Sequence, residues 1–221
     1  MSSVILTHAG KRYADVVALD DVSVQFADGV TTAVVGPSGS GKSTLLKLIN
    51  GLIRPTSGRV SVFGQPINER ELSSLRRRMG YAVQRVGLFP HLTVEENIGL
   101  PTQLACWQSE TRAARVHELM HMVDLDDSYL NRYPHELSGG QAQRVGLCRA
   151  LVLDPSVLLL DEPFGALDAE TRRDVQGEFL RLQKQKPRTT ILVTHDLDEA
   201  RRLAQRIIVL SRGKVVEEMV T

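Results

Sequence analysis

The spacing of hydrophobic positions predicts several strands and one short helix in the first third of the chain. Val22, Val24 and Phe26 alternate with polar residues, which predicts a half-buried strand. Residues 30–35 form a nearly continuous β-branched and apolar run, typical of a strand covered on both faces. A glycine-rich loop follows, and the pattern then predicts a helix over residues 42–50 that ends at Gly51. Turn residues at 54–58 lead into a further predicted strand at 59–63.

The middle of the chain has a different pattern. From about residue 93 to residue 153 the spacing is helical, with a capping box at Thr93 and Glu96 and a helix expected over 110–123. Strands return at 157–160, 189–193 and 207–210, with helices between them, and Asp196 with Glu199 predicts the capped start of the last helix. Residues 207–210 and 215–218 predict a closing hairpin. The layout is an α/β sheet, with the core at about 1–84 and 155–221 and a helical subdomain inserted at about 85–154.

The composition is that of a globular protein without an extreme net charge. The chain has 221 residues, 42% of them hydrophobic, and a formal net charge of +1, so no global field favours nucleic acid or an anionic membrane surface. Cys106 and Cys148 lie far apart without metal-ligand spacing, which fits a reducing compartment, and neither receives a role. No signal peptide is expected, and the longest apolar runs have the length of strands.

Residues 36–43 match the complete pattern G-x-x-x-x-G-K-[ST] between a predicted strand and a predicted helix. Glycines let backbone N–H groups turn toward phosphates, and the helix N-terminus adds partial positive charge. We therefore predict that Lys42 contacts the β- and γ-phosphates of a nucleotide and that Ser43 binds Mg²⁺. The alternative is a glycine-rich turn with a surface lysine. The predicted nucleotide contacts of this loop are Gly36, Pro37, Ser38, Gly39, Ser40, Gly41, Lys42, Ser43 and Thr44.

Two adjacent acids follow the apolar run at 157–160. The carboxyl end of a buried strand is a common place for a site, and neighbouring residues of a strand point apart, so the two acids need different roles. Asp161 fits a residue that either binds Mg²⁺ directly or holds one of the ion's other ligands. Glu162 fits the group that orients and deprotonates an attacking water. The alternative is an acidic turn at the end of a strand.

Residues 137–141, Leu-Ser-Gly-Gly-Gln, predict a second anion site at the start of a helix. Ser138 is a natural N-cap, and Gly139 and Gly140 leave the backbone bare at the helix N-terminus. The stretch resembles the signature motif of ATP-binding-cassette (ABC) ATPases. The resemblance implies that Ser138, Gly139, Gly140 and Gln141 close over the ATP held by the phosphate loop of a second copy, so that two chains enclose two nucleotides.

Further positions resemble motifs of the same family, in its order, along nearly the whole chain. Tyr13 matches the aromatic residue that stacks on adenine, and Gln84, after a predicted strand at 81–83, matches the glutamine that touches Mg²⁺ or water. His195 resembles the histidine that senses the γ-phosphate, and residues 166–168 resemble the loop that contacts the partner protomer. The family fold implied is a P-loop NTPase core with an antiparallel β-subdomain and an inserted α-helical subdomain. The resemblance implies ATP and Mg²⁺ as cofactors, catalytic roles for Glu162, His195, Lys42 and Gln84, and Mg²⁺ binding by Ser43, Gln84 and Asp161.

Residues 84–98 lie where ABC ATPases meet their membrane subunit. The pattern Leu-Phe-Pro-His-Leu-Thr-Val-x-x-Asn resembles bacterial importers, and Gln-x-x-Gly-Leu-Phe-Pro-His is similar to ATPases of glycine betaine and choline uptake, as are residues 48–52. Phe89 is expected either to receive a cytoplasmic helix of the permease or to seal the helical subdomain. Many osmoprotectant ATPases carry a C-terminal regulatory domain, whereas this sequence ends at Thr221, so we expect either a truncation or a member without that domain.

The family implies several partners and leaves other functions open. We expect a second copy of the chain, an integral-membrane permease and, indirectly, a periplasmic or lipoprotein solute-binding protein, with the ATPase peripheral on the cytoplasmic face of the plasma membrane. Nucleic acid is not an expected partner. The alternatives are an amino-acid importer, a soluble ABC protein of DNA repair or translation, and a P-loop metabolite kinase, although the kinase leaves residues 137–141 unexplained.

Overall fold

The chain folds into two compact units in a computed structural model that describes residues 2–83 and 87–221. The first, here called the core unit, comprises Met1–Arg76 and Pro187–Thr221, and the second, the helical unit, comprises Arg77–Lys186. The insertion expected at about 85–154 falls within the residue range of the helical unit, which is wider on both sides, and its boundaries stay a prediction. The predicted role of Gln84 lies outside the described residues.

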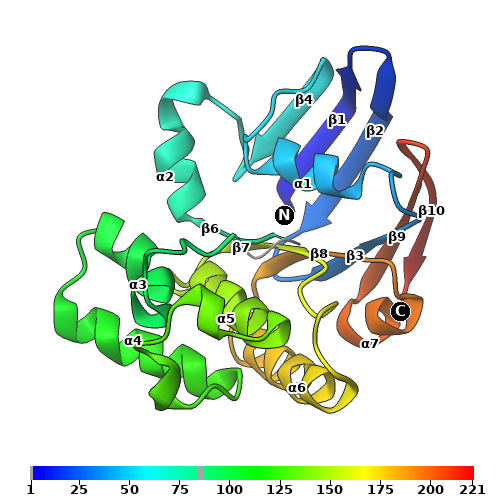
Figure 1. The fold of residues 1–221 in the computed structure, drawn as a ribbon. Coiled ribbons are helices and arrows are strands. Elements are labelled where there is room, and N and C mark those ends of the chain that lie inside the picture. Colours follow the sequence, from blue (N-terminus) through cyan, green and yellow to red (C-terminus); the bar gives the residue numbers. More distant parts are fainter. Residues whose placement is uncertain (1, 84–86) are drawn as a thin grey trace. The chain divides into compact units, whose positions relative to one another are not determined.

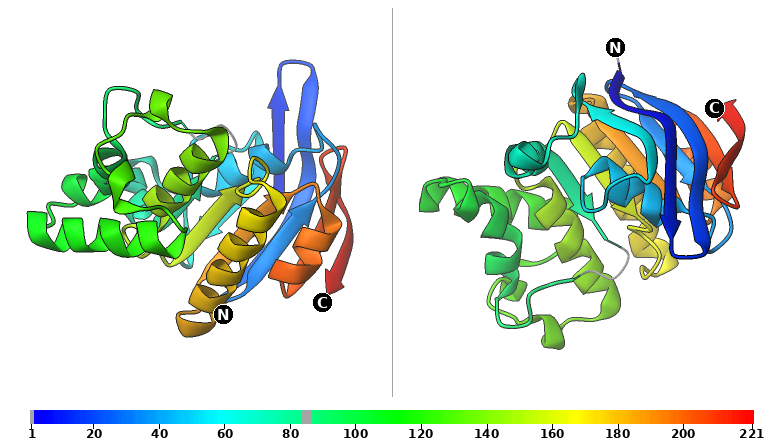
Figure 2. Two further views of the ribbon diagram at one scale, coloured as in Figure 1. Left: turned by 60° about the horizontal axis from the view of Figure 1, so that its bottom comes forward. Right: turned by 90° about the horizontal axis from the view of Figure 1, so that it is seen from above.

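The core unit contains an antiparallel sheet built from the N-terminal part of the chain. Its strand order is β2-β1-β4-β5, and the right-hand view of Figure 2 shows β1, β2 and β4 side by side. The bounds are β1 (Ser2–Tyr13), β2 (Val16–Ala27), β4 (Ser57–Val62) and β5 (Gln65–Pro66). The predicted strands at 22–26 and 59–63 are confirmed. The pattern did not predict β1, because register shifts between Leu6 and Lys11 break its alternation of buried and exposed residues.

A second sheet of the core unit positions the phosphate loop. Strand β3 (Thr31–Val35) is buried along its whole length and pairs in parallel with β8 (Thr189–Thr194) and β9 (Arg206–Ser211). Strand β10 (Lys214–Val220) closes the predicted hairpin with β9. Helix α1 (Lys42–Ile49) contacts β2 and β4, and α7 (Leu197–Leu203) covers β3 through a cluster that includes Ala33, Val35 and Ala200 (Figure 1).

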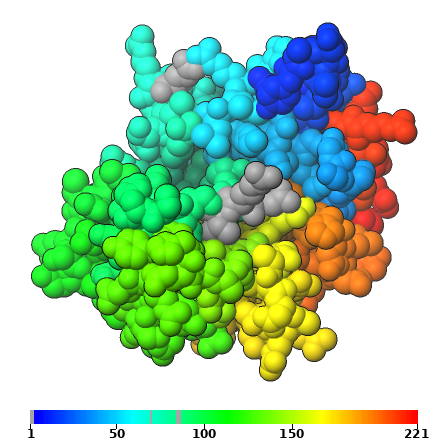
Figure 3. Space-filling view, viewed as in Figure 1, coloured from blue at the N-terminus to red at the C-terminus, as the bar shows by residue number. Residues whose placement is uncertain are grey.

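The helical unit combines two parallel strands, β6 (Met79–Ala82) and β7 (Val157–Asp161), with a set of helices. Helices α3 (Val94–Leu104), α4 (Ser109–Met122) and α5 (Gly139–Leu151) pack against one another, and their green atoms form a continuous surface in Figure 3. The predicted helical character of this region is confirmed. Between α4 and α5 lie the 3-10 turns η2 (Asp127–Tyr129) and η3 (Pro134–Glu136), and α6 (Ala169–Gln185) follows β7.

Two short elements before β6 were not predicted from the pattern. They are the 3-10 turn η1 (Glu69–Glu71) and the helix α2 (Leu72–Arg77), which has six residues and no fully buried side chain, so its pattern is too short to predict a helix. Among the described helices, none is both long and apolar enough to cross a bilayer.

A buried asparagine fixes the loop that enters α3. Asn97 is fully buried, and its side chain accepts from the backbone N–H of Phe89 at 2.8 Å. The same amide donates to the carbonyls of Phe89, Leu92 and Thr93 at 2.9–3.1 Å. The predicted capping box of Thr93 and Glu96 is also present. One side chain therefore forms hydrogen bonds with the backbone of a loop that belongs to no sheet or helix.

We expect Asn97→Ala to destabilise the protein by about 3 kcal/mol, because the substitution leaves buried backbone groups without partners. The partly exposed Glu95, two residues away on the same helix, provides the matched control, since Glu95→Ala removes a side chain of similar size that is not fully buried. Chemical denaturation of both variants measures the difference. Equal midpoints would show that Asn97 does not hold the loop.

Candidate functional site

Backbone atoms of neighbouring strands leave room only for glycine at two positions of the phosphate loop. Gly36 has φ +155°, and a Cβ there would lie 2.0 Å from the carbonyl oxygen of Leu210 at the end of β9. Gly41 has φ +106°, and a Cβ there would lie 2.4 Å from the carbonyl oxygen of Ala18 in β2. The close approach of two strands, as well as the backbone angle, therefore requires glycine at both ends of the loop.

The interior of this loop has the chemistry of an anion site. The Lys42 side chain is 7% exposed, and its Nζ donates to the carbonyls of Gly36 and Pro37 at 2.8 and 2.9 Å. Helix α1 begins at Lys42, and its N-cap residue Gly41 offers no side-chain hydrogen bond to the first turn, where the helix carries partial positive charge. The Oγ of Ser40 is buried and has no hydrogen-bond partner among the described residues. Phosphate oxygens would satisfy each of these groups.

The sheet places His195 beside the start of the loop. Strands β3 and β8 run parallel, with Val35 opposite Thr194. The chain leaves both strands at the next residue, so Gly36 and His195 emerge at the same edge. The His195 side chain is exposed. A histidine at this position can contact a ligand held by the loop.

Tyr13 lies at the end of β1, next to the hairpin turn into β2. Its ring is 43% exposed, and the Nζ of Lys11 lies 5.1 Å from the ring centroid. The same hairpin continues to Ala18, whose carbonyl bounds the phosphate loop. The core unit thus carries Tyr13, the whole phosphate loop and His195.

The two predicted acids belong to the helical unit and have different environments. Asp161 ends β7 with 4% exposure, and burial together with the negative charge of Asp161 raises the pKa of Tyr81 to about 12. Glu162 is partly exposed and has φ +50°, a left-handed conformation that is costly for a glutamate. The two acids thus differ in burial and in backbone conformation, whereas the different roles expected for them stay predictions.

The predicted N-cap of the second anion site is confirmed. Ser138 Oγ accepts from the N–H of Gln141 at 3.2 Å, and Gln141 Oε1 accepts from the N–H of Ser138 at 2.9 Å. Gly139 is exposed, and a Cβ added there would meet nothing within 4 Å. A Cβ on Gly140 would lie 3.3 Å from the carbonyl of Ala166. The start of α5 thus presents an open N-terminus on one side and packs against residues 166–167 on the other.

Sequence reasoning missed Gln143, which joins the two motifs of the helical unit. It is 6% exposed on α5, and its Nε2 donates to the carbonyl of Glu162 at 2.7 Å. Its Oε1 accepts from the N–H of Ala166 at 2.8 Å. The spacing gave no signal, because a glutamine one turn into an amphipathic helix is ordinary in sequence.

Residues at the start of α6 also hold the loop at 166–168. Arg172 donates to the carbonyls of Phe164 and Leu167 at 3.2 and 2.8 Å. Asp168 caps α6, and the backbone N–H of Thr171, which donates to its carboxylate, lowers the pKa of Asp168. This loop is exposed at Ala166 and Asp168, as a surface for a partner requires.

The sequence matches a family model described as ABC transporter over residues 19–165. It is 48% identical over 200 residues to the glycine betaine/carnitine/choline transport ATP-binding protein OpuCA of Bacillus subtilis (strain 168), which covers 90% of this chain and 53% of that protein. It is 46% identical over 212 residues to the glycine betaine uptake system ATP-binding protein YehX of Escherichia coli (strain K12), which covers 96% of this chain and 69% of that protein. The chain therefore spans about half the length of the first relative and about two thirds of the second.

A solved dimeric structure of MJ0796, a bacterial ABC transporter cassette, has the same fold. The TM-score is 0.94 at 35% sequence identity, and 98% of each chain is covered. The predicted α/β fold with its antiparallel and helical parts is thus confirmed by a solved relative as well as by the elements described above.

We expect Gln143→Leu to loosen the turn at 162–166, because the Glu162 carbonyl and the Ala166 N–H each lose a buried partner at a cost of about 1–3 kcal/mol. Hydrogen exchange of the Ala166 amide should accelerate, and the melting temperature should fall. Gln185→Leu, an exposed change at the end of α6, is the control. Unchanged exchange at Ala166 would contradict the bridging role.

Proposed function

The chain belongs to the ABC transporter family, and from this premise we propose that it is the ATP-hydrolysing subunit of a bacterial importer. One observation carries the proposal. The phosphate loop between β3 and α1 holds the ammonium of Lys42 inside a glycine-bounded turn, beside a buried hydroxyl and an uncapped helix N-terminus. This combination favours a nucleotide triphosphate over any uncharged ligand.

The residues present also fit Mg²⁺, which prefers oxygen ligands. Ser43 is the second residue of α1, and the Asp161 carboxylate is buried at the end of β7, where its negative charge helps to raise the pKa of Tyr81. Ser43 and Asp161 would hold the ion, together with Gln84, for which the family resemblance is the support. When bound, the ion would neutralise part of the charge on the phosphates.

Among the described residues, three side chains would carry the catalytic work, beside the role that the family resemblance implies for Gln84. Lys42 would stabilise the negative charge of the β- and γ-phosphates, in place of its bonds to loop carbonyls. Glu162 would accept a proton from the attacking water, and its strained backbone angle is the kind of feature found at reacting groups. His195, which emerges beside the loop, would contact the γ-phosphate.

Two copies of the chain would complete the site. The open N-terminus of α5 at Ser138 and Gly139 has donors for phosphate oxygens, and the exposed loop at Asp168 is available to a partner. The similar cassette MJ0796 has a dimeric structure. A dimer in which the signature residues Ser138, Gly139, Gly140 and Gln141 cover the partner copy's ATP accounts for both surfaces.

Coupling to transport would use the Phe89 surface, defined here as Phe89 and His91. The Phe89 ring is 43% exposed and meets the ring of His91 edge to face, with centroids 6.0 Å apart. Asn97 fixes the backbone of this loop from beneath. An exposed aromatic on a rigid loop is better suited to receive a permease helix than to seal the helical subdomain.

The solute and the membrane location rest on the relatives. One of them is named for glycine betaine, carnitine and choline transport and another for glycine betaine uptake, so we propose quaternary-amine osmoprotectants as the solute. The subunit would sit on the cytoplasmic face of the membrane, with a solute-binding protein as an indirect partner. An amino-acid importer or a soluble ABC ATPase is the alternative. Copurification of a polytopic membrane protein with the untagged chain separates a transporter from a soluble ATPase.

Glu162→Gln should lower the steady-state rate of ATP hydrolysis by about 100-fold or more, since proton abstraction is lost, while ATP affinity is retained. Glu170→Gln changes an exposed glutamate in the first turn of α6 and is the matched control. Steady-state turnover and equilibrium nucleotide binding measure the two effects. Turnover near that of the control would remove Glu162 as the base.

Phe89→Ala should weaken capture of the permease by about 30-fold, because truncation of an interface anchor costs roughly 2 kcal/mol. The melting temperature and ATP affinity of the isolated subunit should stay unchanged, since the ring is half exposed. Leu104→Ala, at an apolar residue 65% exposed at the end of α3, serves as the control. A large fall in melting temperature would mean that Phe89 seals the fold, and unchanged permease capture would exclude it from the interface.

A further inference from the structure

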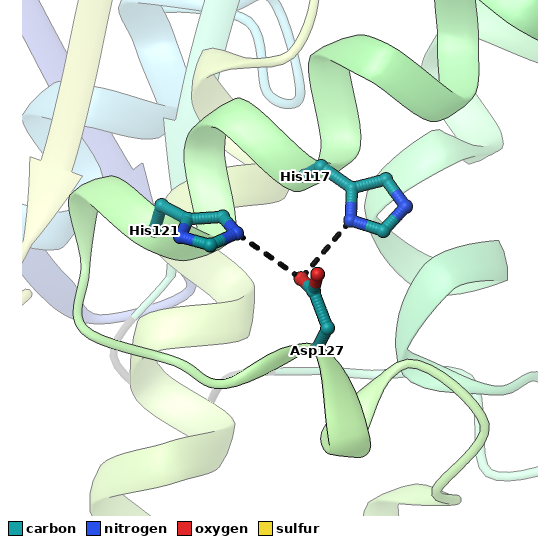
Figure 4. A group of neighbouring side chains, drawn as sticks. All are labelled: His117, His121 and Asp127. Carbon is teal, nitrogen blue, oxygen red and sulfur yellow. Dashed lines mark hydrogen bonds and ion pairs between the residues drawn. The ribbon is translucent and has the colours of Figure 1, made fainter.

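A cluster of two histidines and an aspartate lies on the helical unit, apart from every motif used above. His117 and His121 are four residues apart on α4, which places them on the same face of the helix. Asp127 comes from η2, and Figure 4 shows both imidazoles turned toward its carboxylate. Nδ1 of His117 lies 3.0 Å and Nε2 of His121 lies 3.3 Å from the same oxygen, Oδ1 of Asp127.

These separations are those of ligands that share one ion. Two ligand atoms about 2.0–2.1 Å from a tetrahedral Zn²⁺ are roughly 3.3 Å apart. One potential ligand atom from each of the three residues lies within 4.8 Å of the others. Small rotations of exposed side chains would bring all three onto a common centre.

The position of Asp127 is set by the backbone around it. The turn after α4 is closed by hydrogen bonds from the N–H of Asp124 to His121 and from the N–H of Leu125 to Met120, and the Leu125 side chain is buried. Arg144 of α5 donates to the carbonyl of Asp124 at 2.6 Å. The backbone that leads to Asp127 is thus held beside α4 before any ligand arrives, which lowers the entropy that binding would cost.

The donor set selects a class of cation. Two imidazole nitrogens and one carboxylate oxygen suit Zn²⁺ and neighbouring transition metals, whereas Mg²⁺ and Ca²⁺ prefer oxygen alone. The three side chains are 41%, 67% and 47% exposed, so water can fill the remaining positions. We propose that His117, His121 and Asp127 bind one divalent transition-metal ion of the zinc class, with water completing the coordination.

Binding here would fix the segment that leads to the start of α5. Tyr129, two residues after Asp127 in η2, accepts a hydrogen bond on its hydroxyl from Nε2 of Gln141 at 2.9 Å. Gln141 is the residue that completes the capping box with Ser138. An ion that ties η2 to α4 therefore restrains the tyrosine that holds Gln141. The site itself does not depend on the proposed ATPase function.

Zinc titration of the untagged protein by calorimetry tests the proposal, in a Cys106→Ser background because that thiol is exposed and could bind zinc by itself. We expect one Zn²⁺ per chain at this site, unaffected by excess Mg²⁺. His117→Ala, His121→Ala and Asp127→Asn should each weaken this binding at least tenfold. Circular dichroism of the metal-free variants confirms that they remain folded.

His8→Ala is the matched control, because His8 forms a similar exposed pair with Asp21 at 2.7 Å but has no second histidine. It should leave the zinc affinity unchanged. Binding that is absent, that survives in the His117 and His121 variants, or that falls equally in His8→Ala would overturn the proposal. Hydrogen exchange at residues 125–130 should slow when zinc is added to the unsubstituted cluster and should not change in His121→Ala.

Discussion

Parallel pairing of β3 with β8 and β9 is the constraint on which the core unit depends. All five residues of β3 are buried, so its backbone must find partners on both sides. Because the strands are parallel, their carboxyl ends meet at one edge, where Gly36 and His195 emerge together. The end of β9 lies so close to the loop that a side chain at Gly36 would collide with it. The geometry of the candidate anion site is therefore a consequence of how the sheet ends.

Buried amides have the corresponding role in the helical unit. Asn97 and Gln143 each use both ends of a side-chain amide to hold backbone that belongs to no sheet or helix. In a low-dielectric interior such bonds are strong, and a missing partner is costly, so each amide specifies one loop conformation. One of these loops presents Phe89, and the other presents Glu162. The proposed transport coupling and the proposed hydrolysis thus rest on the same kind of interaction.

The start of α5 connects three features that are separate in the sequence. Its capping box orients Gln141, the side chain of Gln141 donates to the Tyr129 hydroxyl, and Tyr129 belongs to the same 3-10 turn as Asp127 of the proposed metal site. Two residues further along, Gln143 holds the Glu162 turn. The helix N-terminus proposed to meet a nucleotide is therefore held by contacts with two other segments of the chain. Its geometry depends on segments at 127–129 and 162–166, which no local pattern relates to residues 138–141.

The sequence by itself determined what depends on local order. The buried strands at 30–35 and 157–160, the phosphate loop and the Ser138 cap follow from runs, spacing and motifs, and the structure confirms the elements. Strand β1 was not predicted, because its bulges interrupt the alternation of buried and exposed residues. Only the tertiary structure decided that Phe89 is half exposed, that Gln143 bridges to Glu162 and that Asp127 meets His117 and His121. Periodicity reports the face on which a side chain lies, whereas its partners depend on where packing brings distant segments of the chain.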